Sequence, residues 1–134
     1  MKRLEKALQV LQQAKRIPFE ELVGNEILLS AVERNFQVAI ECVLDIGNHI
    51  IAERGFESPK DHEDIIRILG EEVILPSGFA DDLKGIAGFR NILVHEYTDV
   101  DYKVLHHYLQ DRLDDFRSFA NYISDYLEKD STMP

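Results

Sequence analysis

Cysteine is almost absent from this 134-residue chain. Cys42 is the only one, so no disulfide can form within the chain. This usage is typical of a reducing compartment, and we expect a cytoplasmic protein. Proline and glycine are also scarce, with 4 and 7 residues, which excludes a linker-rich chain.

Long apolar runs are missing as well. The longest span only a few residues, too short to cross a membrane, so we expect no membrane contact. The charged start, Met1-Lys2-Arg3, is followed by an amphipathic pattern, so we expect no signal peptide.

Positive charge is scarce relative to negative charge. The chain has 15 Lys and Arg against 25 Asp and Glu, a net charge of -10. Binding to the phosphate backbone depends on basic side chains, so this balance argues against a surface that coats nucleic acid. A protein of this charge that acts on RNA needs a local basic pocket or a partner.

Helical spacing of apolar residues dominates, and alternating strand patterns are nearly absent. We therefore expect an all-α protein: a single domain over residues 1–134, with 130–134 frayed, folded as an up-and-down bundle of four to five helices. A short connector or single turn covers 19–24. The expected helices cover about 1–16, 25–54, a segment starting within 58–62, 79–93 and 102–129.

The longest expected helix has one narrow apolar stripe. A turn of about 100° per residue places six side chains on it: Leu28, Val32, Ala39, Cys42, Ile46 and Ile50. Cys42 is thereby predicted to be a buried apolar residue. Asn35 falls inside the stripe, and its amide needs hydrogen-bond partners there.

Polar functional groups gather in residues 88–97, at the end of an otherwise apolar helix. His95 can transfer protons near neutral pH. Arg90 offers a charged fork for a phosphate. Asn91 precedes His95 by four residues, so the two share a helix face. Gly85 and Gly88 in the same segment suit a close approach by another helix, as at a dimer seam.

The spacing of Arg90 and His95 complicates a single site. They are five residues apart, which places them roughly 140° apart around an ideal helix. One site then requires a distorted last turn, a long reach by the arginine, or a second subunit. Spacing alone leaves another interpretation open, in which His95 and Tyr97 simply end the helix and cap carbonyl groups.

The extended motif has a family resemblance. Arg90-x4-His95-x-Tyr97, with the flanking Phe89, Asn91, Val94 and Glu96, resembles the Arg-x4-His-x-Tyr signature of the HepT toxins of the HEPN superfamily. Residues 34–41 and 45–50 also resemble that family's long helix. The resemblance extends from about residue 28 to residue 127.

The resemblance implies a dimeric, metal-independent endoribonuclease that needs no cofactor. Two protomers would line one composite cleft, with His95 as the acid/base and Arg90 on the scissile phosphate. The RNA's own 2′-hydroxyl would be the nucleophile, leaving a cyclic phosphate. We add a supporting role for Asn91, which would orient His95 or a phosphate.

Tyr97 has a separate implied role. In the family, the motif tyrosine receives AMP from a cognate MntA-type nucleotidyltransferase antitoxin, which silences the toxin. The alternative is that the Tyr97 hydroxyl only forms a hydrogen bond within the site.

Other functions compete with this one. The bundle could be a non-catalytic partner or substrate-binding subunit of a nucleotidyltransferase, a reading that the acidic charge favours. A dimeric scaffold without a ligand would leave the polar cluster unexplained. Glu41, Asp45 and His49 share helical spacing, but with no further ligands nearby we expect no metal site.

Overall fold

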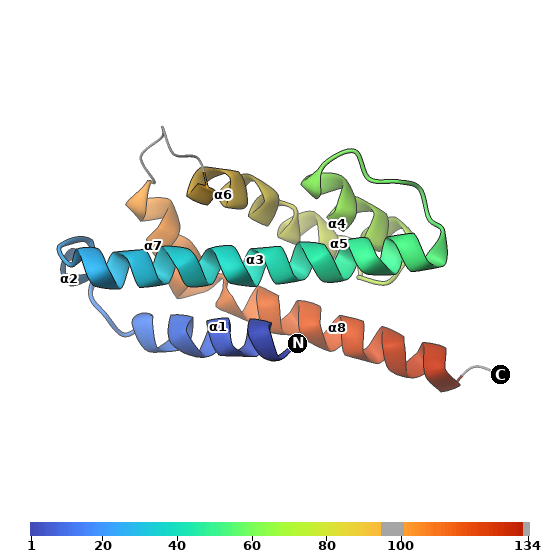
Figure 1. Cartoon of the computed structure of the whole chain (residues 1–134), viewed down its shortest axis with the longest axis horizontal. Helices are drawn as coiled ribbons and strands as arrows, with labels where there is room; N and C mark the ends of the chain where they lie inside the picture. The colour runs from blue at the N-terminus through green and yellow to red at the C-terminus, as the bar shows by residue number, and fades with distance from the viewer. Residues whose placement is uncertain (95–100, 133–134) are drawn as a thin grey trace.

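The computed structural model describes residues 1–94 and 101–132. Within these ranges every regular element is a helix and no strand occurs, which confirms the all-α prediction (Figure 1). The helices are α1 (Lys2–Ala14), α2 (Phe19–Val23), α3 (Glu26–Arg54), α4 (His62–Glu71), α5 (Ser77–Leu83), α6 (Gly85–Val94), α7 (Tyr102–Asp111) and α8 (Leu113–Thr132).

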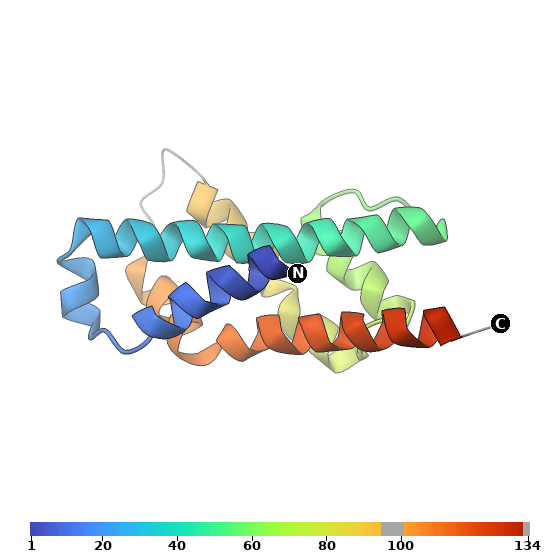
Figure 2. The same ribbon diagram turned by 60° about the horizontal axis from the view of Figure 1, so that its bottom comes forward.

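Helix α3 is the axis of the molecule. It runs along the whole length, with α4, α5 and α6 on one side and α1 and α8 on the other (Figure 1). Helix α1 lies against both α3 and α8 (Figure 2). The side chain of Asn25 accepts hydrogen bonds from two amide groups of the first turn of α3, and Gly55 ends the helix at φ +69°.

The buried face of α3 is wider than the predicted stripe. Val32, Ala39 and Ile50 are buried as expected, but Leu28, Cys42 and Ile46 are only partly buried. The stripe prediction was wrong because helices pack on more than one side of α3. The core side of α3 also includes Leu29, Phe36, Ile40, Val43, Leu44 and Ile51.

Two polar or weakly polar residues of α3 behave differently from each other. Asn35 finds the partner it was predicted to need, because its side-chain nitrogen donates to the Ala31 carbonyl at 2.8 Å. Cys42 is half-buried rather than buried, and this partial burial still raises the pKa of its thiol.

Helix α4 packs closely on α3 and α5. Ile65, Ile66, Ile68 and Leu69 form its apolar face, and all four are buried, as the sequence predicts. A Cβ atom at Gly47 of α3 would lie 2.7 Å from Ile65 Cγ2. A side chain at this position would therefore push α4 away from α3.

The single helix expected over 79–93 is two helices, α5 and α6, divided at Lys84. The end of α5 exposes the Asp82 carbonyl, and the guanidinium of Arg112 donates a hydrogen bond to it at 2.8 Å. An ideal Cβ at Gly85 would lie 3.0 Å from the Tyr108 hydroxyl, so the close approach there is made within the chain. Gly88, by contrast, is exposed with open space around it.

The helix expected over 102–129 is also divided, into α7 and α8, at Arg112. The Arg112 guanidinium forms an ion pair with Asp115 in the first turn of α8 and lies over the ring of Tyr108. The expected count of four to five helices was therefore too low: the described part of the chain contains eight. Within that part, no helix is both long enough and apolar enough to span a membrane.

Candidate functional site

The position of α6 is fixed by an aromatic cluster beneath it. Phe89 is 3% exposed, stacks on the Tyr108 ring with centroids 4.3 Å apart, and meets the Phe36 ring edge-on at 5.2 Å. Such contacts hold a helix in one rotation about its axis. Arg90 and Asn91 follow Phe89 directly, so they lie beside the buried face of α6 and their positions are fixed with it.

Arg90 is half-buried, and its guanidinium forms few hydrogen bonds within the described residues. Nη1 donates to the Asn91 side-chain oxygen at 3.4 Å, a long hydrogen bond. Nε is buried and has no acceptor among residues 1–94 and 101–132. Leaving a buried donor of a charged group unpaired is costly, and such a donor is a feature of sites that receive an acceptor from a ligand.

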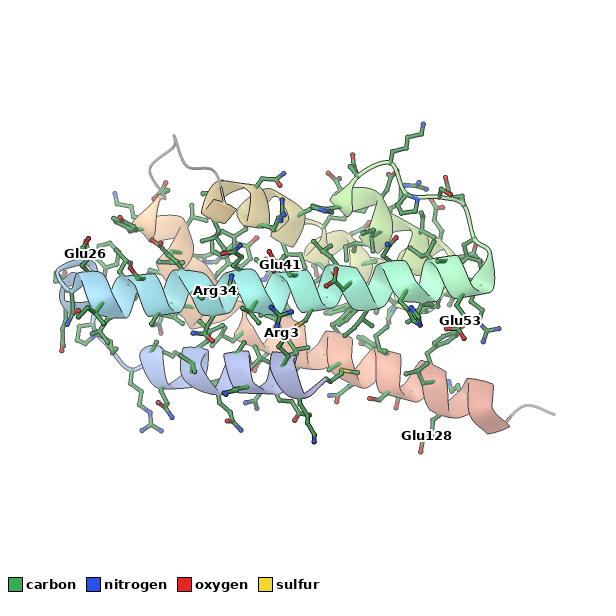
Figure 3. The ribbon with its side chains drawn as sticks, in the orientation of Figure 1. Arg3, Glu26, Arg34, Glu41, Glu53 and Glu128 are labelled. Atoms are coloured by element: carbon green, nitrogen blue, oxygen red, sulfur yellow. The ribbon has the colours of Figure 1, made fainter. Side chains whose placement is uncertain are left out.

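A cavity of about 200 Å³ lies beside this guanidinium. We call it the Arg90 pocket, and its lining comes from α3, α4 and α6: Glu41, Leu44, Asp45, His62 and Arg90. Figure 3 shows Glu41 on the side of α3 that faces α6. The Glu41 carboxylate accepts from the Gln37 amide at 3.2 Å and forms no ion pair with Arg90.

A second hollow of about 340 Å³ continues along α6. It is lined by Asp61, His62 and Glu63 on one side and by Ala87, Gly88 and Asn91 on the other. His62 borders both hollows. The open space around Gly88 leaves this face of α6 accessible to another molecule.

Hydrogen bonds fix the turn that carries His62. Asp61 caps α4 by accepting from the Asp64 amide at 2.9 Å, and the Asp64 carboxylate accepts from the Lys60 amide at 2.9 Å. The Arg67 guanidinium also donates to Asp64, at 3.2 Å. The Lys60 amide and Arg67 together hold the pKa of Asp64 below its usual range.

The predicted site residues divide into two groups. Arg90 and Asn91 are in contact at 3.4 Å, with Arg90 lining the Arg90 pocket and Asn91 lining the second hollow along α6. His95 and Tyr97 lie outside the described residues, so the predicted pairing of Asn91 with His95 stays a prediction. His62 was missed by sequence reasoning because no motif or helical spacing connects it to Arg90; only the packing of α4 beside α6 does.

No cluster of metal-ligating side chains occurs in residues 1–94 and 101–132. His49 pairs with Glu53 at 3.4 Å rather than with Asp45, and both side chains are exposed. His107 pairs with Asp111 at 3.1 Å, and His106 lies edge-on to Phe19. These three histidines are therefore engaged in local contacts away from Arg90.

Comparison with known proteins identifies a family. The model of the family described as "Ribonuclease HepT-like" matches residues 4–123. The mRNA nuclease HepT of Shewanella oneidensis is 31% identical over 96 residues, 72% of each chain. The tRNA nuclease HepT of Aphanizomenon flos-aquae is 29% identical over 121 residues, 90% of this chain and 82% of that protein.

A solved structure gives the same result for the fold. The tri-AMPylated HEPN toxin of Shewanella oneidensis, in complex with its MNT antitoxin, superposes with a TM-score of 0.83 at 26% identity, covering 92% of both chains. The match extends over nearly all helices described above. The chain therefore belongs to the ribonuclease HepT-like family and is an endoribonuclease of the HEPN type.

Proposed function

We propose that this chain is the RNase toxin of a toxin–antitoxin pair and cleaves RNA without a metal ion. The observation that carries the proposal is the guanidinium of Arg90, which presents a buried, unpaired Nε beside a cavity at the family's motif position. A phosphate oxygen is an acceptor that fits such a donor. The mRNA and tRNA nucleases among the relatives support RNA as the substrate class.

In the proposed reaction, the 2′-oxygen of the RNA attacks the adjacent phosphorus, and the bond to the 5′-oxygen breaks. His95 transfers a proton, and Arg90 binds the phosphate oxygens that gain charge in the transition state. The proposed supporting role of Asn91 is to orient His95 or a phosphate, and its side-chain oxygen lies 3.4 Å from Arg90 Nη1. The products are a 2′,3′-cyclic phosphate and a 5′-hydroxyl.

The proposed active form is a homodimer in which both protomers contribute to one cleft. The exposed face of α6 around Gly88 supports this form, because nothing in the described part of the chain covers it. A cleft shared by two protomers also resolves the roughly 140° separation expected between Arg90 and His95 on one helix. A second guanidinium would add to the positive charge that the acidic surface lacks.

The proposed control is AMP transfer to Tyr97 by a cognate nucleotidyltransferase antitoxin. The toxin of Shewanella oneidensis that is similar in fold is tri-AMPylated and bound to an MNT antitoxin, which supports this regulation. Added phosphates would bring negative charge and bulk to a site that must bind the phosphates of RNA. Incubation of the chain with its antitoxin and ATP should add AMP masses, and Tyr97→Phe should prevent the addition.

The first test is cleavage of tRNA and mRNA in EDTA by protein whose intact mass shows no added AMP. The unmodified protein should cleave, and His95→Ala should abolish cleavage. Arg90→Lys keeps the charge but loses the planar fork, and should slow cleavage by about 100-fold. Arg34→Lys is the matched control, since Arg34 is an exposed arginine of α3 that does not line the Arg90 pocket.

The opposite result has a clear meaning. If unmodified protein cleaves none of these RNAs, the enzyme proposal fails for this chain. The acidic side chains around Arg90 would then favour the non-catalytic alternative, a partner or substrate-binding subunit of a nucleotidyltransferase.

A further inference from the structure

His62 stands apart from the other described histidines. His49 and His107 are paired with carboxylates, and His106 contacts the Phe19 ring. The side chain of His62 has no hydrogen bond, ion pair or ring contact within residues 1–94 and 101–132. It is nevertheless half-buried and held in place by the capped first turn of α4.

The surroundings of His62 place it beside the guanidinium that is proposed to bind phosphate. It lines the Arg90 pocket together with Arg90, and it lines the hollow along α6 together with Asn91. A phosphate bound by Arg90 in this pocket would therefore share the pocket with His62. Within the Arg90 pocket, the other polar groups are the carboxylates of Glu41 and Asp45.

Cleavage by 2′-hydroxyl attack requires two proton transfers: one from the 2′-hydroxyl and one to the departing 5′-oxygen. A carboxylate beside the RNA repels the phosphate unless a proton or a cation offsets its charge. An imidazole in this pocket could meet both requirements, because it can carry a transferable proton, and His62 lines the pocket together with Glu41, Asp45 and Arg90.

Resting on the function proposed above, we infer that His62 is a second catalytic imidazole, the proton donor to the 5′-oxygen. His95 takes the proton of the 2′-hydroxyl as the bond from the 2′-oxygen to phosphorus forms. The bond from phosphorus to the 5′-oxygen breaks, and that oxygen receives the proton of His62. Proton exchange with water returns both imidazoles to their starting forms.

The inference predicts a particular pH dependence. A proton donor to the leaving oxygen makes cleavage fall toward high pH, so the alkaline limb of the rate profile should differ between wild type and His62→Gln. The charged groups around the imidazole lie on three elements. They are Glu41 and Asp45 of α3, Lys60, Asp61 and Glu63 at the start of α4, and Arg90 of α6.

The decisive experiment uses two RNAs that differ at one atom. One is an RNA that the wild-type protein cleaves, and the other carries a 5′-bridging sulfur at the same cleavage position. A thiolate leaves without protonation, so the second RNA needs no proton donor. His62→Gln should cleave the oxygen RNA at least about 100-fold more slowly than wild type, yet cleave the sulfur RNA at nearly the wild-type rate. His95→Ala should be slow on both.

The controls separate this inference from the function on which it rests. His49→Gln, on the exposed surface of α3, should leave both rates unchanged. Thermal unfolding should show that each variant is folded. Equal slowing of His62→Gln on both RNAs, or wild-type rates on both, would overturn the role of His62 while the RNase function stands. If no RNA can be found that the wild-type protein cleaves, both the RNase function and the role of His62 are overturned.

Discussion

Val73 adopts a backbone conformation that a β-branched residue rarely takes. Its φ is +60°, in the left-handed region, directly after the end of α4. The amide of Val73 donates to the Gly70 carbonyl and the amide of Ile74 donates to the Leu69 carbonyl, the pattern that closes many helices and usually has glycine at this position. The burial of Ile74 and Leu75 immediately afterwards holds the chain in this turn.

Val73→Gly should therefore raise the free energy of unfolding, by about 1 kcal/mol, because glycine adopts this conformation without strain. The Val73 side chain is 81% exposed, so its loss removes little packing. Urea denaturation measures the effect. The matched control is Ile27→Gly, since Ile27 is 82% exposed but helical, and this change should lower stability. A loss of stability in Val73→Gly would contradict the strain argument.

Arg90 and Asn91 show how much of the site the local sequence could predict. Their residue types predict a phosphate site, and the structure brings the two side chains into contact, with Arg90 lining one hollow and Asn91 lining the next. His62 could not be found this way, because a histidine at the start of a helix is also an ordinary surface residue. Its position in the lining of the Arg90 pocket follows from the packing of α4 against α6, which the sequence pattern does not specify.

At the scale of elements, the contact of α3 with α4 decides where His62 lies. Gly47→Ala should lower the free energy of unfolding by about 1–3 kcal/mol, because the new methyl group overlaps Ile65 Cγ2 and approaches Leu69 Cδ1. It should also slow RNA cleavage, since α4 must shift. Gly78→Ala, in the open first turn of α5, should be neutral or stabilising. Equal stability of the two variants in thermal unfolding would contradict this account.

The first turn of α4 should also respond to pH. The lowered pKa of Asp64 means that its charged form stabilises the fold above the carboxyl group's unfolded pKa of about 4, and that this contribution is lost as the pH falls through the lower folded pKa. Asp64→Asn should therefore unfold more easily than wild type at pH 7. The two should become equally stable at acidic pH, as pH-dependent urea denaturation would measure.

The Asp64 prediction has a simple control. Glu63→Gln changes the neighbouring carboxyl group, which has no capping hydrogen bond in the described structure, so the difference from wild type should stay small at every pH. A stability difference for Asp64→Asn that persists unchanged in acid would show that the carboxylate charge is not its source.

Two of the predicted helices divide where tertiary contacts compete with the helix. At Lys84 and at Arg112 the local residues are compatible with helix, and the periodic apolar pattern continues through both positions. Contacts between distant segments accompany both breaks: the Arg112 guanidinium donates to the Asp82 carbonyl, and Tyr108 packs on Phe89. Sequence periodicity cannot detect such a break, because the chain on either side stays amphipathic.

At the scale of the whole molecule, the open question is the second protomer. If one cleft is built by two chains, Arg90→Ala and His95→Ala should each be nearly inactive alone. Mixing them under conditions that allow subunit exchange should restore part of the activity, because a mixed dimer retains one arginine and one histidine. Cleavage assays of the mixture, with sedimentation velocity to determine the dimer, measure this.

Two results would contradict the shared cleft. One is sedimentation as a monomer at the concentration where the wild-type protein cleaves RNA. The other is a mixed dimer, detected by mass, that is as inactive as its parents. A Gly88→Ala variant is a further probe: its Cβ atom meets nothing within 4 Å, so a change in dimerisation would indicate a neighbouring protomer at this position.

The sequence by itself determined the all-α class, the bounds of the longest helix and the location of the polar motif, because these depend on local periodicity, capping residues and residue chemistry. The tertiary structure alone decided which faces of α3 are buried, where two helices break, and that His62 lies beside Arg90. The physical reason is that these features depend on contacts between segments far apart in the chain. A local sequence pattern does not specify which of these segments pack together.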